Sequence, residues 1–172
     1  MNKILTAVGL ALAAMGASAA TYNWGPLAAQ VDSNLSYEAA GQFTDVYLFS
    51  LGGANNGVSS VVSLDLSQVF DISNGTYSLW KDQGAAGPSA DDIELGSWTF
   101  SGTTGSTSHS LMLGSGSYYY LVTGTADGSG DGAGHAGIYS IAAAVLPVPE
   151  PASAALLLAG LIGAVVRRRV QR

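Results

Sequence analysis

The chain of 172 residues contains no cysteine, and its six lysine and arginine residues are outnumbered by twelve aspartates and glutamates. Without cysteine there are no disulfides and no thiolate metal centres, so core packing must hold the fold together. The shortage of basic side chains excludes a surface that binds phosphate groups, so nucleic acid is not an expected partner. The two histidines, His109 and His135, are too few for a zinc site.

Sequence motifs for catalysis are absent as well. The chain has neither a Gly-x-Ser-x-Gly elbow nor a His-Glu-x-x-His pair. His109 and His135 lie among serines and glycines, a setting typical of surface loops. We therefore expect no enzyme, no catalytic residue and no confident metal or cofactor site, and a secreted hydrolase is the least favoured function.

The first residues have the pattern of a secretory leader. Lys3 precedes an apolar run over residues 4–15, and Ala17-Ser18-Ala19 follows as a small-x-small motif. This order predicts a signal peptide over residues 1–19, with cleavage by signal peptidase after Ala19 or Ala20. An uncleaved membrane helix is the alternative, and the short apolar run disfavours it.

The last residues combine a rigid motif, an apolar run and a basic end. Val148-Pro149-Glu150-Pro151 stays extended, because proline fixes φ and lacks an N–H. The apolar run over residues 152–166 is short of the roughly 20 residues that span a bilayer comfortably. Arg167, Arg168 and Arg169 follow it and are expected to stop transfer on the cytoplasmic side.

Residues 147–172 resemble a PEP-CTERM sorting signal, the C-terminal tag of Gram-negative bacteria that make exopolysaccharide. The resemblance implies transient inner-membrane insertion through a short transmembrane helix, and then recognition and cleavage near the motif by an exosortase. It further implies delivery to the cell surface or extracellular matrix, with exopolysaccharide as a partner. A structural or interaction role in a biofilm is the function that follows, and a carbohydrate- or ice-binding module is the alternative.

Residues 20–146 remain as one expected domain once both ends are removed. They contain eleven acidic residues, and Lys81 is their only lysine or arginine, so the formal charge is about −10. Short runs rich in Val, Tyr, Phe and Leu alternate with Gly, Ser and Thr, as in all-β proteins. We expect strands over residues 43–51, 58–70, 76–81, 93–101, 108–113, 118–125 and 137–145.

Seven such strands predict a single antiparallel β-sandwich of jelly-roll or Ig-like type, flanked by the signal helix and the transmembrane helix. Asn56-Gly57 and Asn74-Gly75 are expected to form tight turns, because both residue types tolerate positive φ. Gly114-Ser115-Gly116 is expected to join two paired strands as a hairpin.

The first expected strand carries an acidic residue among aromatic ones. Period-two alternation places Phe43, Asp45, Tyr47 and Phe49 on one face. An unpaired buried carboxylate is costly, so Asp45 should accept hydrogen bonds, bind a cation or lie at the rim of the sheet. The segment resembles the FxDxF family of PEP-CTERM proteins and, less closely, bacterial pre-peptidase C-terminal domains. Neither resemblance implies a catalytic motif.

Two acidic clusters are candidates for calcium, which would then raise the melting temperature. Asp127 and Asp131 are spaced like the start of a calcium loop, but Ile138 stands where an EF-hand requires glutamate. A flexible hairpin loop is the favoured interpretation there. Asp91, Asp92 and Glu94 form the second cluster, for which a solvated turn is the favoured interpretation.

Three tryptophans could stack on sugar rings if they were exposed. Trp98 stands in an apolar strand and is expected in the core. Trp80 stands beside Lys81 near a strand end, so it is the best of the three candidates for binding, although packing in the core or at the rim is the favoured interpretation.

Overall fold

A computed structural model describes residues 18–27, 31–53, 55–63, 69–84, 86–101 and 107–147, and all the regular elements in them are β-strands. The strands are β1 (Ser18–Pro26), β2 (Asp32–Ala39), β3 (Gly41–Leu51), β4 (Asn55–Ser63), β5 (Ile72–Asp82), β6 (Ile93–Phe100), β7 (Thr107–Leu113), β8 (Gly116–Ala126) and β9 (His135–Pro147). The predicted signal helix and transmembrane helix lie outside the described residues.

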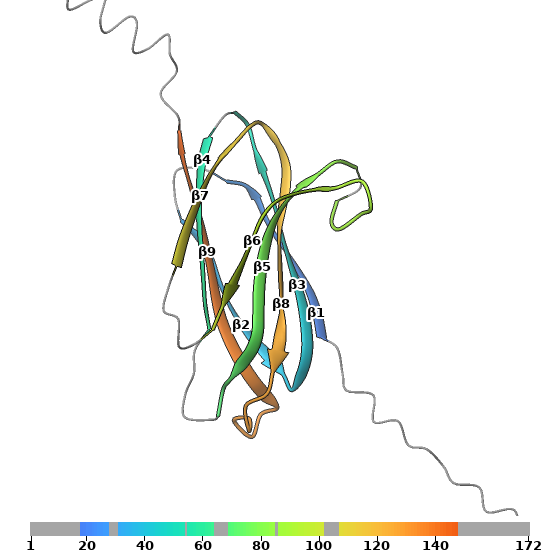
Figure 1. The fold of residues 1–172 in the computed structure, drawn as a ribbon, viewed down its shortest axis with the longest axis vertical. Helices are drawn as coiled ribbons and strands as arrows, with labels where there is room; N and C mark the ends of the chain where they lie inside the picture. The colour runs from blue at the N-terminus through green and yellow to red at the C-terminus, as the bar shows by residue number, and fades with distance from the viewer. Residues whose placement is uncertain are drawn as a thin grey trace, which may run out of the picture.

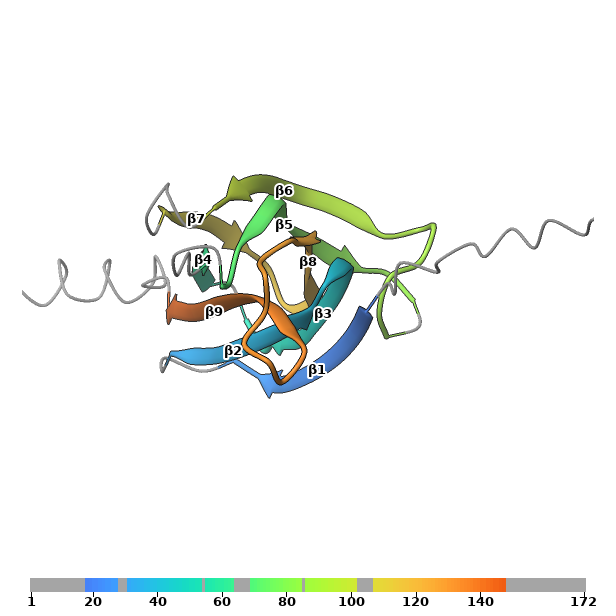
Figure 2. The same cartoon turned by 90° about the horizontal axis from the view of Figure 1, so that it is seen from below.

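The strands form two sheets packed as a sandwich (Figures 1 and 2). One sheet has the order β1-β3-β8-β5-β6, and the other has the order β2-β9-β4-β7. The all-β class is confirmed, but the expectation of purely antiparallel sheets is wrong. Strand β1 runs parallel to β3, since Ser18 pairs with Phe43 and Pro26 pairs with Ser50.

Two of the predicted tight turns are wrong, because their Asn-Gly pairs lie inside long strands. Asn56-Gly57 lies within β4, and Asn74-Gly75 lies within β5. Asn74 does have positive φ, at 54°, but it forms part of a bulge against β8. Gly114 and Ser115 connect β7 to β8, which belong to different sheets, so they form no hairpin.

Aromatic side chains fill the space between the sheets. Tyr47, Tyr77 and Tyr139 are fully buried. Phe49 of β3 stacks between two rings of the neighbouring β8, with centroid distances of 5.6 Å to Tyr118 and 5.2 Å to Tyr120. Such cross-strand aromatic pairs stabilise a sheet beyond the area that they bury.

The β8–β9 connection contains a glycine, Gly128, that is packed tightly against neighbouring backbone. A larger residue there would force that backbone to shift. A Cβ atom on Gly128 would lie 2.4 Å from the carbonyl oxygens of Val69 and Ala136. The Gly128 N–H donates to the Ala136 carbonyl at 3.1 Å, which holds the backbone in this close approach.

We therefore expect Gly128→Ala to lower the free energy of unfolding by about 3 kcal/mol, the upper range for overpacked sites. Urea unfolding of the exported protein measures this change. Gly52→Ala is the matched control, because a Cβ there meets nothing within 4 Å. Equal stability of the two variants would contradict the close packing around Gly128.

Candidate functional site

The inward face of β3 carries the residues of the FxDxF-like segment. Phe43, Asp45, Tyr47 and Phe49 have exposed fractions of 2%, 1%, 0% and 4%. The predicted alternation is therefore confirmed for this strand. The row faces the opposite sheet, where Phe43 stacks on Tyr139 of β9 at 5.5 Å between ring centroids.

Asp45 is held by donors from three other strands. Its Oδ1 accepts the backbone N–H of Ala20 of β1 at 3.0 Å. Its Oδ2 accepts the hydroxyl of Ser36 of β2 at 3.2 Å and the phenol of Tyr139 of β9. Of the three readings from the sequence, the contacts support the hydrogen-bonded carboxylate, and the deep burial contradicts a place at the rim.

A second buried acid, Glu38 of β2, completes the network. It is 4% exposed, and its Oε1 and Oε2 accept the hydroxyls of Ser36 at 2.6 Å and Ser18 at 2.9 Å. Ser36 thus contacts both Glu38 and Asp45, although a hydroxyl has one proton to donate. We call Ser18, Ser36, Glu38, Asp45 and Tyr139 the acidic network.

The acidic network lies where the edge strands β1 and β2 close one side of the sandwich (Figure 2). Tyr47 extends it, since its phenol oxygen lies 2.7 Å from that of Tyr139 and accepts from Asn34 at 3.3 Å. Burial raises the pKa of Tyr47 to about 12 and also raises the pKa of Tyr139. Both phenols therefore stay protonated near neutral pH and serve as donors.

Burial also raises the pKa of Glu38, while the hydrogen bond from Ser36 opposes this shift. The nearby charge of Asp45 raises the pKa of Glu38 further. The charge of one carboxyl group therefore disfavours the ionisation of Glu38.

Of the cluster of Asp91, Asp92 and Glu94, the two aspartates lie in a hydrogen-bonded turn before β6. Asp92 accepts the backbone N–H of Gln83 at 2.9 Å through Oδ1 and that of Ser89 at 2.8 Å through Oδ2. These bonds, chiefly the one from Gln83, lower the pKa of Asp92. Asp91 accepts the Ser89 hydroxyl at 2.6 Å, and Glu94 is exposed on β6.

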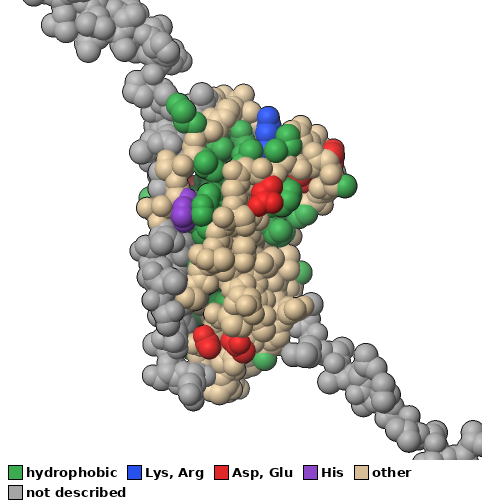
Figure 3. All heavy atoms as spheres, viewed as in Figure 1, with side chains coloured by type: hydrophobic (Ala, Val, Ile, Leu, Met, Phe, Trp, Pro, Cys, Tyr) green, Lys and Arg blue, Asp and Glu red, His purple; other side chains and the backbone are tan. Residues whose placement is uncertain are grey.

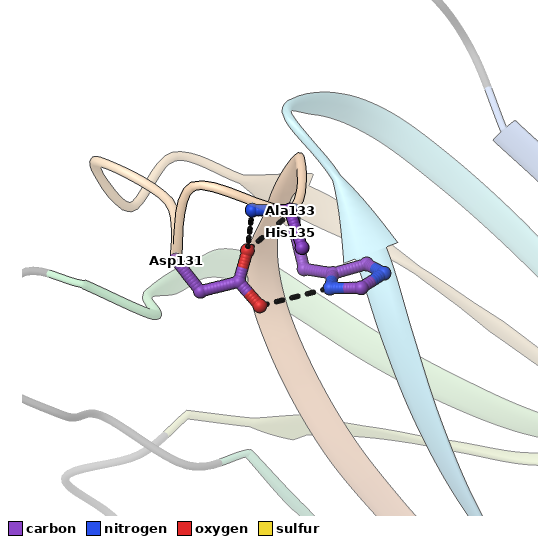
Figure 4. A network of polar contacts seen from close by, with 3 residues as sticks. All are labelled: Asp131, Ala133 and His135. Atoms are coloured by element: carbon purple, nitrogen blue, oxygen red, sulfur yellow. Dashed lines mark hydrogen bonds and ion pairs between the residues drawn. The ribbon is translucent and has the colours of Figure 1, made fainter.

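The Asp127 and Asp131 pair lies in the connection between the two sheets, so the predicted hairpin loop is wrong. Asp127 accepts the hydroxyl of Ser73 at 2.7 Å. Asp131 accepts the backbone N–H of Ala133 at 2.8 Å, and its Oδ2 lies 2.9 Å from Nδ1 of His135 (Figure 4). Among the described residues, no three His, Asp or Glu side chains come together as metal ligands.

We expect the pair of Asp131 and His135 to make stability depend on acidity. The hydrogen bond from His135 lowers the pKa of Asp131 from 3.8 to about 2. A lowered carboxyl pKa contributes stability above pH 3.8 that disappears as the pH falls toward 2. Asp131→Asn should thus melt slightly below the native protein at pH 6, and the two should converge near pH 2 by calorimetry. A difference that persists at pH 2 would contradict this account.

The outer face of the five-stranded sheet carries a line of threonines. Thr44 of β3 pairs with Thr123 of β8, Thr123 pairs with Thr76 of β5, and Thr76 pairs with Thr99 of β6. Thr44 and Thr99 are exposed, and the other two are half-buried. Neighbouring strands lie 4.7–4.9 Å apart, so this threonine row is about 14 Å long.

A shallow polar pocket lies beside the threonine row. Its volume is about 320 Å³, and its polar lining comes from Gln42, Thr44, Asn74, Thr123 and Thr125. Charged side chains are scarce around the middle of the sandwich: Figure 3 shows mainly uncharged polar surface over the lower parts of β5, β6 and β8, with acidic groups at the bottom. The surface offers hydroxyl and amide groups rather than charge.

Two tryptophans of the five-stranded sheet pack against neighbouring rings. Trp98 packs partly buried against the core, as expected, and stacks on His109 at 4.6 Å. Trp80 is half-buried, stacks on Tyr119 at 6.2 Å and donates its Nε1–H to Ser78 at 2.7 Å. Both histidines lie in strands, so the prediction of loop histidines is wrong.

Sequence reasoning identified Asp45 but missed its partners. In β2 the polar residues Ser36 and Glu38 are buried, whereas Leu35 and Tyr37 are 53% and 51% exposed. In β2 the polar side chains thus face inward and the apolar ones face solvent, the reverse of the usual pattern. The sequence does not reveal this reversal, because it depends on which face of β2 lies against Asp45. The threonine row was missed because it depends on the pairing of strands that are distant in sequence.

Some solved structures are similar in outline. They include the pre-peptidase C-terminal domain of a collagenase from Bacillus anthracis, with 15% identity over 73% of this chain and 94% of that chain and a TM-score of 0.42. They also include PliG of Aeromonas hydrophila, a periplasmic inhibitor of g-type lysozyme, with 12% identity over 76% and 100% and a TM-score of 0.44. No curated protein matches the chain.

The sorting tail begins where the sandwich ends. Strand β9 ends at Pro147, and the described part of the chain contains no helix suited to crossing a membrane. Residues 147–169 match the model of the PEP-CTERM protein-sorting motif, a range that includes Val148-Pro149-Glu150-Pro151 and Arg167 to Arg169. The match supports export, transient anchoring through the tail and processing by an exosortase. The chain thus carries a PEP-CTERM protein-sorting motif that follows directly on a β-sandwich.

Proposed function

We propose that the sorted sandwich is a non-catalytic component of the extracellular exopolysaccharide matrix. It contacts neutral polysaccharide through the threonine row. The observation that carries the proposal is the alignment of four threonines across four neighbouring strands of one outer face. The route to the exterior rests on the sorting motif at residues 147–169.

The chemistry of the threonine row suits sugar hydroxyls. Each threonine hydroxyl donates one hydrogen bond and accepts others, as a sugar hydroxyl does. The pocket beside the row adds the side-chain amides of Gln42 and Asn74. Both Thr44 and Thr99 are exposed, so a chain lying along the row reaches hydroxyls at its two ends.

The acidity of the domain narrows the class of polysaccharide. Residues 20–146 carry a formal charge of about −10, which repels uronic-acid or sulfated polymers. A neutral polysaccharide is therefore the favoured partner.

The burial of the acidic network supports a non-catalytic role. Asp45 and Glu38 are 1% and 4% exposed, so neither carboxyl group reaches a polymer at the surface. Their contacts link β1, β2, β3 and β9, and serve the fold instead.

An ice-binding module is the second candidate, since it also needs a regular row of threonines. The twist that sheets have by nature disfavours it, because adjacent strands rotate by roughly 20° and an ice surface is flat. Inhibition of ice recrystallisation by the native protein would favour this candidate.

We expect the triple variant Thr44→Val, Thr99→Val and Thr123→Val to bind neutral polysaccharide about 100-fold more weakly. Valine keeps the shape and the β-propensity, and each lost hydrogen bond costs about 1 kcal/mol. Binding of the released protein to immobilised dextran, with alginate as the acidic comparison, measures the change. Thr21→Val is the control, because Thr21 is exposed on β1 outside the row. Undiminished binding by the triple variant would contradict the proposal.

A further inference from the structure

The predicted end of the leader lies inside β1, next to two buried carboxyl groups. Cleavage is predicted after Ala19 or Ala20, whereas β1 begins at Ser18. The Ala20 N–H donates to Asp45 Oδ1 at 3.0 Å, and the Ser18 hydroxyl donates to Glu38 Oε2 at 2.9 Å. Removal of the leader therefore changes the donor at Asp45 from an amide N–H to a terminal amino group. It also takes the Ser18 hydroxyl away from Glu38.

The two carboxyl groups lack a basic partner among the residues that the structure describes. Asp45 and Glu38 share the single hydroxyl proton of Ser36. Lys81 is the only lysine or arginine between residues 18 and 147, and its Cε lies next to Gly116 at the start of β8. A buried carboxylate is stabilised best by an opposite charge at hydrogen-bonding distance.

The other titratable groups around the site are phenols. Tyr22 of β1 lies 3.4 Å from the Ser36 hydroxyl, and Tyr139 of β9 donates to Asp45. Tyr47 of β3 contacts Tyr139 at 2.7 Å. A phenol can donate a hydrogen bond to a carboxylate, but it carries no positive charge. These residues therefore do not neutralise Asp45 or Glu38.

We propose that cleavage between Ala19 and Ala20 creates an α-ammonium group that forms a buried ion pair with Asp45. Water hydrolyses the amide bond: the Ala19 carbonyl gains the hydroxyl oxygen, and the Ala20 nitrogen gains hydrogen and takes a further proton from solvent. The new ammonium keeps its place at Asp45 Oδ1 and gains N–H donors, while Glu38 loses the Ser18 hydroxyl. The inference rests on the proposed export of the chain.

The rest of β1 keeps the new terminus in place. Pairing with β3 continues from Thr21, opposite Val46, to Pro26, opposite Ser50, after residues 18 and 19 are gone. Cleavage one bond later would instead put the ammonium on Thr21, which is exposed on the outer face and has lost the Ala20 donor. The geometry thus selects the bond after Ala19, and the sandwich reaches its full stability only after the leader is removed.

The test uses the full chain, produced with its own leader in a bacterium that has an exosortase. N-terminal sequencing of the released protein should give Ala20. The ordinary pKa of an α-amino group is about 7.7–8.0, and the carboxylate should raise it by at least about one unit. Acetylation of the α-amino group at pH 7 should then be at least about tenfold slower in the native protein than in urea.

A chain that begins at Ala17 is the comparison, because it has a peptide bond at Ala20 and retains the Ser18 hydroxyl at Glu38. It should melt below the released protein at pH 7. A raised amino pKa contributes stability that is present below pH 8 and is lost as the pH rises through the folded value, so the two chains should converge above about pH 10. Asp45→Asn, where it folds, should restore ordinary acetylation.

A released protein that begins at any other residue overturns the inference, and so does an Ala20 amino group that reacts at the same rate in the native protein and in urea. Both results leave the polysaccharide proposal untouched. Conversely, loss of dextran binding concerns the threonine row alone.

Discussion

Replacing Asp45 by alanine is expected to lower the free energy of unfolding by about 4 kcal/mol, in the extreme range for a single substitution. The change leaves the Ala20 N–H and the Tyr139 phenol without their acceptor, while the Ser36 hydroxyl keeps only Glu38. Each orphaned buried donor costs about 1–3 kcal/mol, and the cavity adds to this. The effect on the sandwich is large because these donors come from three different strands.

Urea unfolding, followed by tryptophan fluorescence, measures the loss in the exported protein. Asp45→Asn keeps one acceptor oxygen in place and should fall between alanine and the native residue. Asp32→Ala is the control, because it removes a carboxylate from the start of β2 without touching the donors to Asp45. A loss below 1 kcal/mol for Asp45→Ala would contradict the structural role of this network.

Changing Pro149, Glu150 and Pro151 together to alanine is expected to abolish release almost completely. The exosortase then lacks its motif, while the apolar run and the arginines still hold the chain in the inner membrane. Cell fractionation and immunoblotting should find the variant in the membrane fraction and the native protein outside the cell. Gln171→Ala, beyond the matched residues 147–169, should be released normally.

The same fractionation decides against the sorting account if the triple alanine variant is released as efficiently as the native protein. Partial release would also count against it, since no other cleavable motif stands between β9 and the apolar run. The result is independent of the stability of the sandwich, because the changed residues follow its last strand, which ends at Pro147.

Sequence alone predicted the all-β class and the buried row of β3, because both depend on local alternation. It failed at β1, where Ser18 to Ala20 have the composition of a leader end and also pair in parallel with Phe43 to Asp45. It also failed at Asn74-Gly75, where positive φ serves a bulge inside β5 instead of a turn. The residues themselves do not distinguish a leader end from a strand, or a turn from a bulge. The outcome depends on pairing with a neighbouring strand that is distant in sequence.

The candidate sites were predictable to a smaller extent. The anomaly of Asp45 was visible as a carboxylate among aromatic residues, but Ser36 and Glu38 became its partners only through the meeting of β1 and β2 at the closed edge. The threonine row requires the order β3-β8-β5-β6, which joins segments up to about 80 residues apart in the chain. The sorting motif was predictable in full, because an exosortase reads it as a linear peptide.

The measurement that tests the central claim most directly is the intact mass of the protein recovered outside the cell. Sorting through the PEP-CTERM motif predicts a chain that has lost the apolar run and the arginines and ends close to Pro149-Glu150-Pro151. Extracellular protein that still ends at Arg172 would contradict this account.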